Sequence, residues 1–292
     1  MYMRTPISII TGYLGAGKTT LLKNILNKAD KKIAVIMNEF GEIDIDSKII
    51  KGKNINIVEL AGGCVCCSLT GEFELATKEI IKKYKPDIIV VETTGLAEPD
   101  TLIFDIENEL PDLKLDSIIA LVDSDAFFKF PLGKTGKIQV EMADIIILNK
   151  VDLINNKELN KLEKEIKNLN NRANIVKTKF ASVDNHILFG IYSKRDIKKE
   201  INHEHTKNIE FFSFKSNKIF DKEKFEEFIR NLSKEIYRAK GFINLDKKFY
   251  LFNFVAQKYS LEEFKADKTE LVFIGENVNK IKEKILKQLS AL

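Results

Sequence analysis

The sequence has few cysteines, and their placement argues against a disulfide framework. Its three cysteines, Cys64, Cys66 and Cys67, fall within four positions and follow the pair Gly62-Gly63. An odd number of clustered thiols cannot pair completely. We therefore expect thiols that are free for other chemistry.

The sequence also lacks long hydrophobic runs. No apolar stretch approaches the roughly 20 residues that a helix needs to span a bilayer. The N-terminal segment Met1–Pro6 leads directly into a strand pattern and lacks the features of a signal peptide. We expect a cytoplasmic protein with no membrane partner, in which the thiols stay reduced.

A strong charge of one sign is absent as well. The 47 basic and 43 acidic residues leave a formal net charge of +4, and the lysines are interspersed with glutamates. Because nucleic-acid-binding proteins normally carry a basic patch, we expect no nucleic-acid partner. The composition is that of an ordinary globular protein, and the length of 292 residues predicts one large and one small domain.

The first part of the chain alternates short β-branched runs with amphipathic segments of helical length. Runs such as Ile88–Val91 and Ile145–Leu148 are continuously apolar, as is typical of strands buried on both faces. The pattern predicts an α/β fold with a mainly parallel sheet flanked by helices. The predicted strands are Ile7–Thr11, Ile33–Asn38, Ile55–Leu60, Asp87–Glu92, Ser117–Asp123, Ile145–Asn149 and Ile175–Thr178, and the predicted helices are Lys18–Lys28, Leu69–Tyr84, Asp100–Asn108 and Lys157–Asn170.

The pattern changes after a charged stretch, Ser193–Asn208, that is almost free of apolar residues. We place a linker there, at 196–208, between a first domain at 1–195 and a second at 209–292. The order strand, helix, three strands and helix predicts a small α+β domain after the linker. The expected elements are a strand at Ile209–Lys215, a helix at Asp221–Ala239, strands near Phe242–Leu245, Tyr250–Ala256 and Glu270–Ile274, and a helix at Val278–Leu289.

A phosphate-binding loop follows the first predicted strand. Residues 12–19 read GYLGAGKT and fit the pattern G-x-x-x-x-G-K-[ST], with a helical run behind them. Backbone N–H groups and the helix N-terminus attract phosphate, Lys18 reaches the β- and γ-phosphates, and Thr19 ligates Mg²⁺. The expected nucleotide-binding residues of the loop are Gly12, Gly15, Ala16, Gly17, Lys18 and Thr19.

A second motif indicates which nucleotide binds. Asn149-Lys150-Val151-Asp152 comes directly after a buried strand, in the correct order behind the phosphate loop. The carboxylate of Asp152 can accept two hydrogen bonds from guanine, whereas adenine lacks that pair of donors. We expect Asn149 to brace the loop and contact the base, and we predict GTP as the ligand.

Glu92-Thr93-Thr94-Gly95 lies between these motifs and follows the buried strand DIIVV. A carboxylate at that strand end suits a group that binds Mg²⁺ through its water or that orients the attacking water, and the Gly95 N–H suits a sensor of the γ-phosphate. A capped turn before the next helix is the alternative, but it does not explain Glu92. We therefore regard Lys18, Glu92 and Gly95 as the catalytic candidates.

The cysteine cluster is a candidate metal site. Thiolates suit Zn²⁺, Cu⁺ and, less specifically, Co²⁺, and the sequence has no second cysteine pair that would close a four-thiolate cage. An open site with at most three thiolates suits delivery of metal better than a structural role. A redox relay and buried, inert cysteines are the alternatives.

Two other segments could contribute metal ligands. The acidic segment Asn38–Asp46 follows the second strand, and Glu42 is its best candidate for a further ligand, although a solvated loop explains it equally well. His203 and His205 could capture metal in the linker, but ordinary surface histidines are the simpler interpretation. We assign no role to His186.

These elements together resemble the CobW-type family of P-loop GTPases. The family includes cobalamin-synthesis CobW proteins, zinc-linked metallochaperones and nitrile hydratase activators. The resemblance spans nearly the whole chain, and its GGCVCC element is highly specific. The matching elements are GYLGAGKTT, NEFGEIDID, ELAGGCVCCSL, VVETTGLAEP, LVDSDAF, ADIIILNKVDL, RAKGF and LVFIG.

The resemblance implies a GTP-dependent metallochaperone with a C-terminal CobW-like domain. It implies that Thr20 joins Gly17, Lys18 and Thr19 in binding phosphate and Mg²⁺, that Asn149 and Asp152, with Lys150 between them, read guanine, and that the three cysteines bind Zn²⁺ or Co²⁺. The implied partner is a metalloprotein client, and the chain would be a monomer or a homodimer that depends on nucleotide or metal. Many members carry a long histidine-rich stretch, of which this chain keeps only His203-Glu204-His205. The alternative function is a GTP-controlled thiol redox or metal sensor that regulates a protein partner.

Arginine is scarce, and this predicts slow hydrolysis of GTP. None of the five arginines lies between Thr5 and Asn171. The segments that follow the predicted strands near the phosphate loop, Asn38–Asp46 and Glu92–Gly95, therefore have no arginine finger of their own. Without such a group in cis or in trans, hydrolysis by P-loop GTPases is slow. We expect a single-turnover rate for the isolated protein below about 1 s⁻¹, measured by rapid quench. A faster rate would contradict the interpretation of the chain as a slow switch.

Overall fold

The computed structural model describes residues 4–29, 31–37, 55–59, 70–95, 98–130, 132–189 and 209–292. These residues fall into two compact units, one within 4–189 and the other within 209–292. The predicted linker at 196–208 lies outside the described residues, so the exact domain boundaries stay a prediction.

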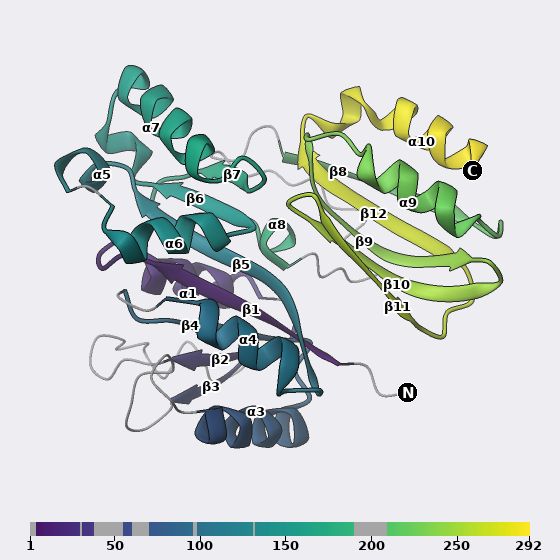
Figure 1. Ribbon diagram of the computed structural model, residues 1–292, viewed down its shortest axis with the longest axis horizontal. Coiled ribbons are helices and arrows are strands. Elements are labelled where there is room, and N and C mark those ends of the chain that lie inside the picture. The colour runs from purple at the N-terminus through teal and green to yellow at the C-terminus, as the bar shows by residue number, and fades with distance from the viewer. Residues whose placement is uncertain are drawn as a thin grey trace. The chain divides into compact units, whose positions relative to one another are not determined.

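The first unit is built on a seven-stranded sheet in which every paired strand is parallel to its neighbour (Figure 1). This confirms the predicted α/β fold. In spatial order the strands are β3 (Ile55–Glu59), β2 (Ile33–Met37), β4 (Ile88–Glu92), β1 (Thr5–Gly12), β5 (Leu113–Asp123), β6 (Ile145–Asn149) and β7 (Asn174–Lys177).

Continuous apolar runs place these strands inside the unit. All five residues of β2 and all five of β6 are buried, as expected for strands covered on both faces. Since the strands are parallel, their C-terminal ends meet along one edge of the sheet. Ligands of open parallel sheets bind outside that edge, and the segments with chemical motifs leave the strands there.

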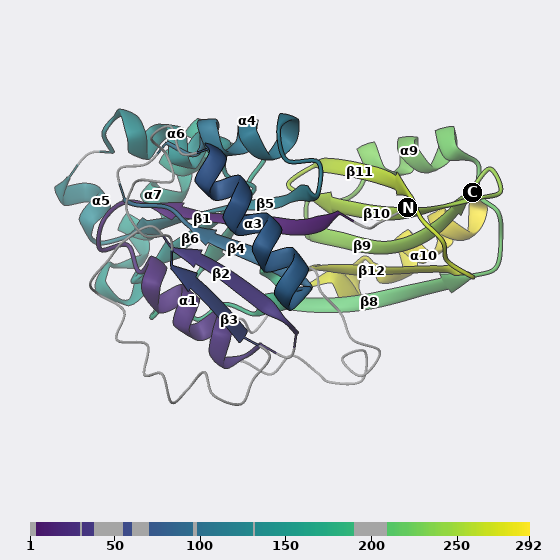
Figure 2. The ribbon, with the colours of Figure 1, turned by 90° about the horizontal axis from the view of Figure 1, so that it is seen from below.

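Helices cover the sheet, and the four long helices predicted for this unit are confirmed. They are α1 (Lys18–Asn27), α3 (Thr70–Tyr84), α4 (Asp100–Asn108) and α7 (Asn156–Leu169), whereas α5 (Ala126–Lys129), α6 (Lys134–Met142), the 3₁₀ turn η1 (Val151–Leu153) and α8 (Asn185–Phe189) were not predicted. Helices α3 and α4 pack on β1, β2 and β4 through one apolar cluster, and α1 lies on the other face (Figure 2). Among the described helices, none is both long and apolar enough to cross a membrane.

The second unit contains a five-stranded antiparallel sheet and two main helices, in agreement with the predicted α+β class. The strands, in spatial order, are β11 (Lys258–Glu263), β10 (Lys248–Val255), β9 (Ile236–Leu245), β12 (Thr269–Glu276) and β8 (Ile209–Ser216). The helices are α9 (Lys222–Arg230) and α10 (Lys282–Ala291), the latter preceded by the 3₁₀ turn η3 (Val278–Lys280).

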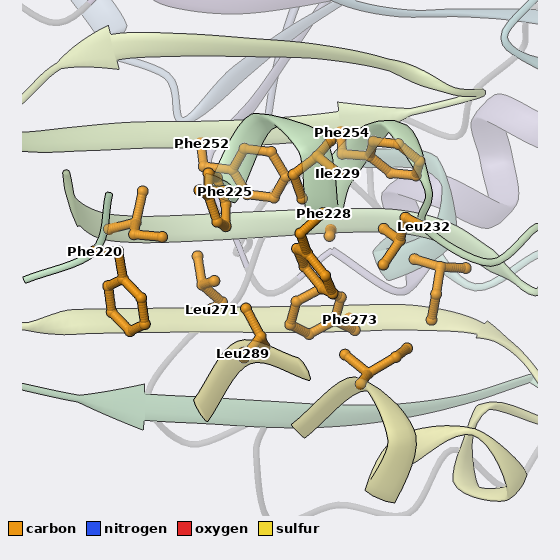
Figure 3. Packing of buried hydrophobic residues seen from close by; sticks show 14 of the residues in the cluster. Phe220, Phe225, Phe228, Ile229, Leu232, Phe252, Phe254, Leu271, Phe273 and Leu289 are labelled. Atoms are coloured by element: carbon orange, nitrogen blue, oxygen red, sulfur yellow. The ribbon is translucent and has the colours of Figure 1, made fainter. Parts of the chain in front are cut away.

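Phenylalanines dominate the core of the second unit (Figure 3). Phe225 of α9 meets Phe252 of β10 edge to face, with ring centroids 5.2 Å apart. Phe212 and Phe273, from the paired strands β8 and β12, stack at 5.0 Å. Such aromatic pairs add to the free energy of burial, so α9 and the sheet form one body.

Two predictions in this unit were wrong. The expected helix Asp221–Ala239 ends at Arg230, because the chain turns after Asn231 and residues from Ile236 onward pair with β10 and β12. Strand pairing here overrides a sequence pattern that also suits a helix. The strand β11 was not expected, since most of its residues are only half-buried and its apolar pattern is weak.

Candidate functional site

The phosphate loop connects β1 to α1 with the backbone that its glycines permit. Gly12, Gly15 and Gly17 have φ angles of 140°, 77° and 105°, a region that favours glycine. The Lys18 ammonium donates to the Gly12 carbonyl at 2.9 Å, and the side chain is only 8% exposed. The loop therefore holds a buried positive charge at the N-terminus of a helix, which suits a phosphate group.

Thr19 and Glu92 bring a hydroxyl oxygen and a carboxylate oxygen together beside this loop. The Thr19 hydroxyl lies 3.5 Å from Glu92 Oε1, in donor geometry. Glu92 ends β4, where it lies opposite Ile10 of β1 and Met37 of β2. Hydroxyl and carboxylate oxygens are the ligands that Mg²⁺ prefers, so these residues fit the ion that accompanies a nucleotide.

The segment after β4 lies against the phosphate loop at Gly95. A Cβ on Gly95 would approach the backbone nitrogen of Leu14 to 2.7 Å, so no larger residue fits without a shift. The Gly95 carbonyl accepts a hydrogen bond from Gln139 Nε2 at 3.2 Å. The segment with Glu92 and Gly95 therefore packs closely against the loop that holds Lys18.

Asn149 joins the phosphate loop to a third segment. Its Nδ2 donates to the Ala16 carbonyl at 2.9 Å, and its Oδ1 accepts from the Ala181 N–H at 2.8 Å. The side chain is 2% exposed, and a Cβ on Gly17 would lie only 2.5 Å from Nδ2. The two motifs and the 178–182 loop, which follows β7, thus form one site.

The two residues that follow have different surroundings. Lys150 adopts a left-handed backbone with φ of 61° and forms an ion pair with Asp123 at 2.6 Å. Asp123 also accepts hydrogen bonds from the N–H groups of Asp125 and Ala126. Asp152 is exposed in η1. Its carboxylate is therefore accessible at the same edge as Asn149.

The structure shows anchoring residues that the sequence patterns did not reveal. Asn24 of α1 donates to the carbonyls of Phe180 and Ala181 at 2.8 and 3.0 Å. Asp123 fixes Lys150. A carboxylate at the end of the strand neighbouring β6 was the signal available for Asp123, whereas nothing in the pattern marked Asn24.

The remaining predicted site residues lie outside the described residues. They are Cys64, Cys66, Cys67 and Glu42, together with His203 and His205 of the linker. Within the part of the chain that the structure describes, no three His, Cys, Asp or Glu side chains gather in a way that could hold a metal ion. The metal site stays a prediction from the sequence.

Two family models match the chain. The model described as "CobW/HypB/UreG, nucleotide-binding domain" matches residues 6–177. The model described as "Cobalamin synthesis protein cobW C-terminal domain" matches residues 209–292. The first model covers most of the first unit, up to the end of β7, and the second covers the whole of the second unit.

Individual relatives point the same way. A zinc chaperone CobW from Sinorhizobium sp. is 30% identical over 294 residues, covering 84% of this chain and 83% of the relative. The zinc-regulated GTPase metalloprotein activator 1 of Schizosaccharomyces pombe is 29% identical, with 94% of this chain and 83% of the relative covered. The crystal structure of the Zn(II)-bound YjiA GTPase from Escherichia coli is similar with a TM-score of 0.52 and 25% identity, over 100% of this chain and 99% of that one.

The Asn149 bridge predicts a specific loss of stability. Substitution Asn149→Ala leaves the buried Ala16 carbonyl and Ala181 N–H without this partner, at about 1–3 kcal/mol for each group that stays unpaired. We expect a lower free energy of unfolding for the first unit, measured by hydrogen exchange of the β1 and β6 amides. Asn156→Ala, at an exposed position of α7, is the matched control and should change it by no more than about 0.5 kcal/mol. Equal effects of the two variants would show that the bridge is not structural.

Proposed function

The chain belongs to the CobW/HypB/UreG family, and from that premise we propose that it is a GTP-dependent metallochaperone. It binds GTP at the site around Lys18 and Asn149, carries zinc at the cysteine motif and passes the metal to a client metalloprotein. Relatives with 30% and 29% identity are named as a zinc chaperone and as a zinc-regulated GTPase metalloprotein activator. Co²⁺ is the other metal that the thiolates would accept.

One observation carries the nucleotide half of this proposal. Asn149 binds the phosphate loop at Ala16 and the 178–182 loop at Ala181, so the phosphate end and the base end of a ligand would meet one rigid edge. A phosphate loop alone occurs in many nucleotide-binding proteins. Its physical connection to Asn149-Lys150-Val151-Asp152 is what supports a guanine nucleotide.

The exposed carboxylate of Asp152 would select the base. It can accept hydrogen bonds from guanine N1–H and the exocyclic amine. Adenine lacks this pair of donors, so the carboxylate would be left without partners when adenine fills the site. Gly12, Gly15, Ala16 and Gly17 would surround the phosphates with N–H groups, and Lys150 would lie beside the base.

The residues around Thr19 fit hydrolysis that is slow and controlled. Lys18 and Thr20 would bind phosphate oxygens, and Thr19 would hold the Mg²⁺ that neutralises charge on the β- and γ-phosphates when bound. Glu92 would orient water or the ion's hydration shell, and the Gly95 N–H would respond to the γ-phosphate. The lack of an arginine between Thr5 and Asn171 leaves the developing charge without that stabilisation.

Topology supports a coupling between nucleotide and metal. β3, β2 and β4 are neighbours in the sheet and parallel, so they end at the same edge beside β1. The segment with Glu42 follows β2, the cysteine motif follows β3, and Glu92 ends β4. We propose that GTP draws these segments together so that Cys64, Cys66, Cys67 and Glu42 hold the metal, and that hydrolysis releases it.

The second unit is proposed to meet the client. Residues 1–195 would form the GTPase domain, 196–208 the linker and 209–292 the client-binding domain. The protein would act as a monomer or as a homodimer that forms with nucleotide or metal. The alternative proposal is a GTP-controlled redox or metal sensor, in which the thiols report to a partner and deliver nothing.

Removal of one thiolate tests the metal half. Cys66→Ser should weaken zinc binding by at least about tenfold, since substitution of a residue that only hydrogen-bonds a metal ligand already lowers metal affinity by about this factor. It should also stop GTP-dependent transfer of zinc to a chelator. Zinc content is measured after equilibrium dialysis, with Ser68→Ala as the neighbouring control that keeps all three thiols. If Cys66→Ser keeps full zinc binding and loses only its reactivity with peroxide, the sensor is correct and the chaperone is wrong.

A further inference from the structure

The 178–182 loop forms hydrogen bonds with three residues outside it, Asn149, Asn24 and Val151. Ala181 donates its N–H to Asn149, and Asn24 donates to the carbonyls of Phe180 and Ala181. The buried Thr178 hydroxyl lies in donor geometry with the Ser182 carbonyl at 3.0 Å, and the Thr178 carbonyl accepts from the Val151 N–H. This loop therefore joins helix α1 directly to the turn that carries Asp152.

Phe180 is unusual within this fixed loop. Its side chain is 72% exposed, the largest exposed fraction among the large hydrophobic side chains of the described residues. Its φ angle is 54°, and Ala181 follows with 49°. Residues other than glycine adopt this backbone conformation at a cost in free energy. The conformation persists only where surrounding bonds impose it. Those bonds come from Asn24 and Asn149, so the fold holds an apolar ring in water next to the base-reading motif.

We propose that Phe180 is the aromatic platform on which the base of the guanine nucleotide stacks, and that Asn24 is the residue that positions it. This inference rests on the proposed binding of GTP. Phe180 directly precedes Ala181, whose N–H binds Asn149. The hydrogen bond from the Val151 N–H to the Thr178 carbonyl connects the same loop to the turn with Asp152. A purine face offers the ring a flat apolar partner, and stacking would remove its surface from water.

Other exposed apolar side chains near this edge are less suited to the role. The Phe128 ring lies under the Lys161 ammonium, 5.4 Å from its centroid, and so already has a cationic partner. Phe130 follows the short helix α5, which comes after β5 and not after β6 or β7. Of these aromatic side chains, Phe180 is the one whose backbone is bonded into the Asn149 network.

The two parts of base recognition would then differ in kind. Stacking strengthens binding of any purine, because every base has a π-face. Selection of guanine stays with Asp152, which reads the edge of the base. Loss of Phe180 should therefore lower affinity for GTP and GDP alike without changing the preference for guanine over adenine.

A single tryptophan tests the stacking directly. The chain contains no tryptophan, so Phe180→Trp makes its indole the only such fluorophore in the full-length protein. Addition of GDP with Mg²⁺ should quench its emission in a saturable manner. Phe104→Trp is the matched control, since Phe104 is 59% exposed on α4, which follows β4 and not β6 or β7; its emission should not change. If the indole of Phe180→Trp stays unquenched at saturating GDP, the inference is overturned.

Affinity measurements separate this inference from the proposed function. By calorimetry, Phe180→Ala should bind GDP about 5- to 100-fold more weakly than the natural protein, whereas Phe180→Tyr should bind nearly as well. Asn24→Ala, placed in the Phe180→Trp background, should reduce the quenching because the ring is no longer fixed. If the natural protein does not bind GDP, the proposed function fails; if it binds GDP and Phe180→Ala binds equally well, only the stacking role fails.

Discussion

The arrangement of the proposed nucleotide site depends on the two hydrogen bonds of the Asn149 side chain. Its amide has one donor bond to Ala16 and one acceptor bond to Ala181, and at 2% exposure water has little access to replace either. Asn149 ends β6, and the order β1-β5-β6 places it two strands from the phosphate loop. Both ends of a bound nucleotide would therefore be positioned by one amide, and Asn24 and Gly17 complete the same arrangement.

The parallel sheet explains how a second function can be attached to this edge. The C-terminal ends of parallel strands lie along one edge of the sheet, so segments that are far apart in sequence are brought together there. β1 carries the phosphate loop, β4 carries Glu92, and the proposed metal segments follow β2 and β3. Gly95 leaves no room for a side chain against Leu14. This close packing puts the segment after β4 directly against the phosphate loop, as the proposed coupling requires.

The sequence predicted the features that depend on local patterns. The buried strands were readable because they are continuously apolar, and the phosphate loop because its spacing serves one purpose. Asn24 and the 178–182 loop were not readable, since their role comes from contacts with residues more than 30 positions away. The helix expected at Asp221–Ala239 failed for the same reason: pairing of β9 with β10 and β12 decides the conformation from Ile236 onward. The cysteine motif, which is outside the described residues, rests on the sequence alone.

The proposed chaperone cycle depends on control of the metal affinity by the nucleotide state. The most direct measurement is a titration of the protein with Zn²⁺, in the presence of GDP and, separately, of a non-hydrolysable GTP analogue. We expect zinc to bind more tightly with the analogue than with GDP, by about fivefold or more. Zinc should tighten binding of the analogue relative to GDP by the same factor, because the coupling free energy is reciprocal. Equal zinc affinities in the two nucleotide states would contradict this expectation.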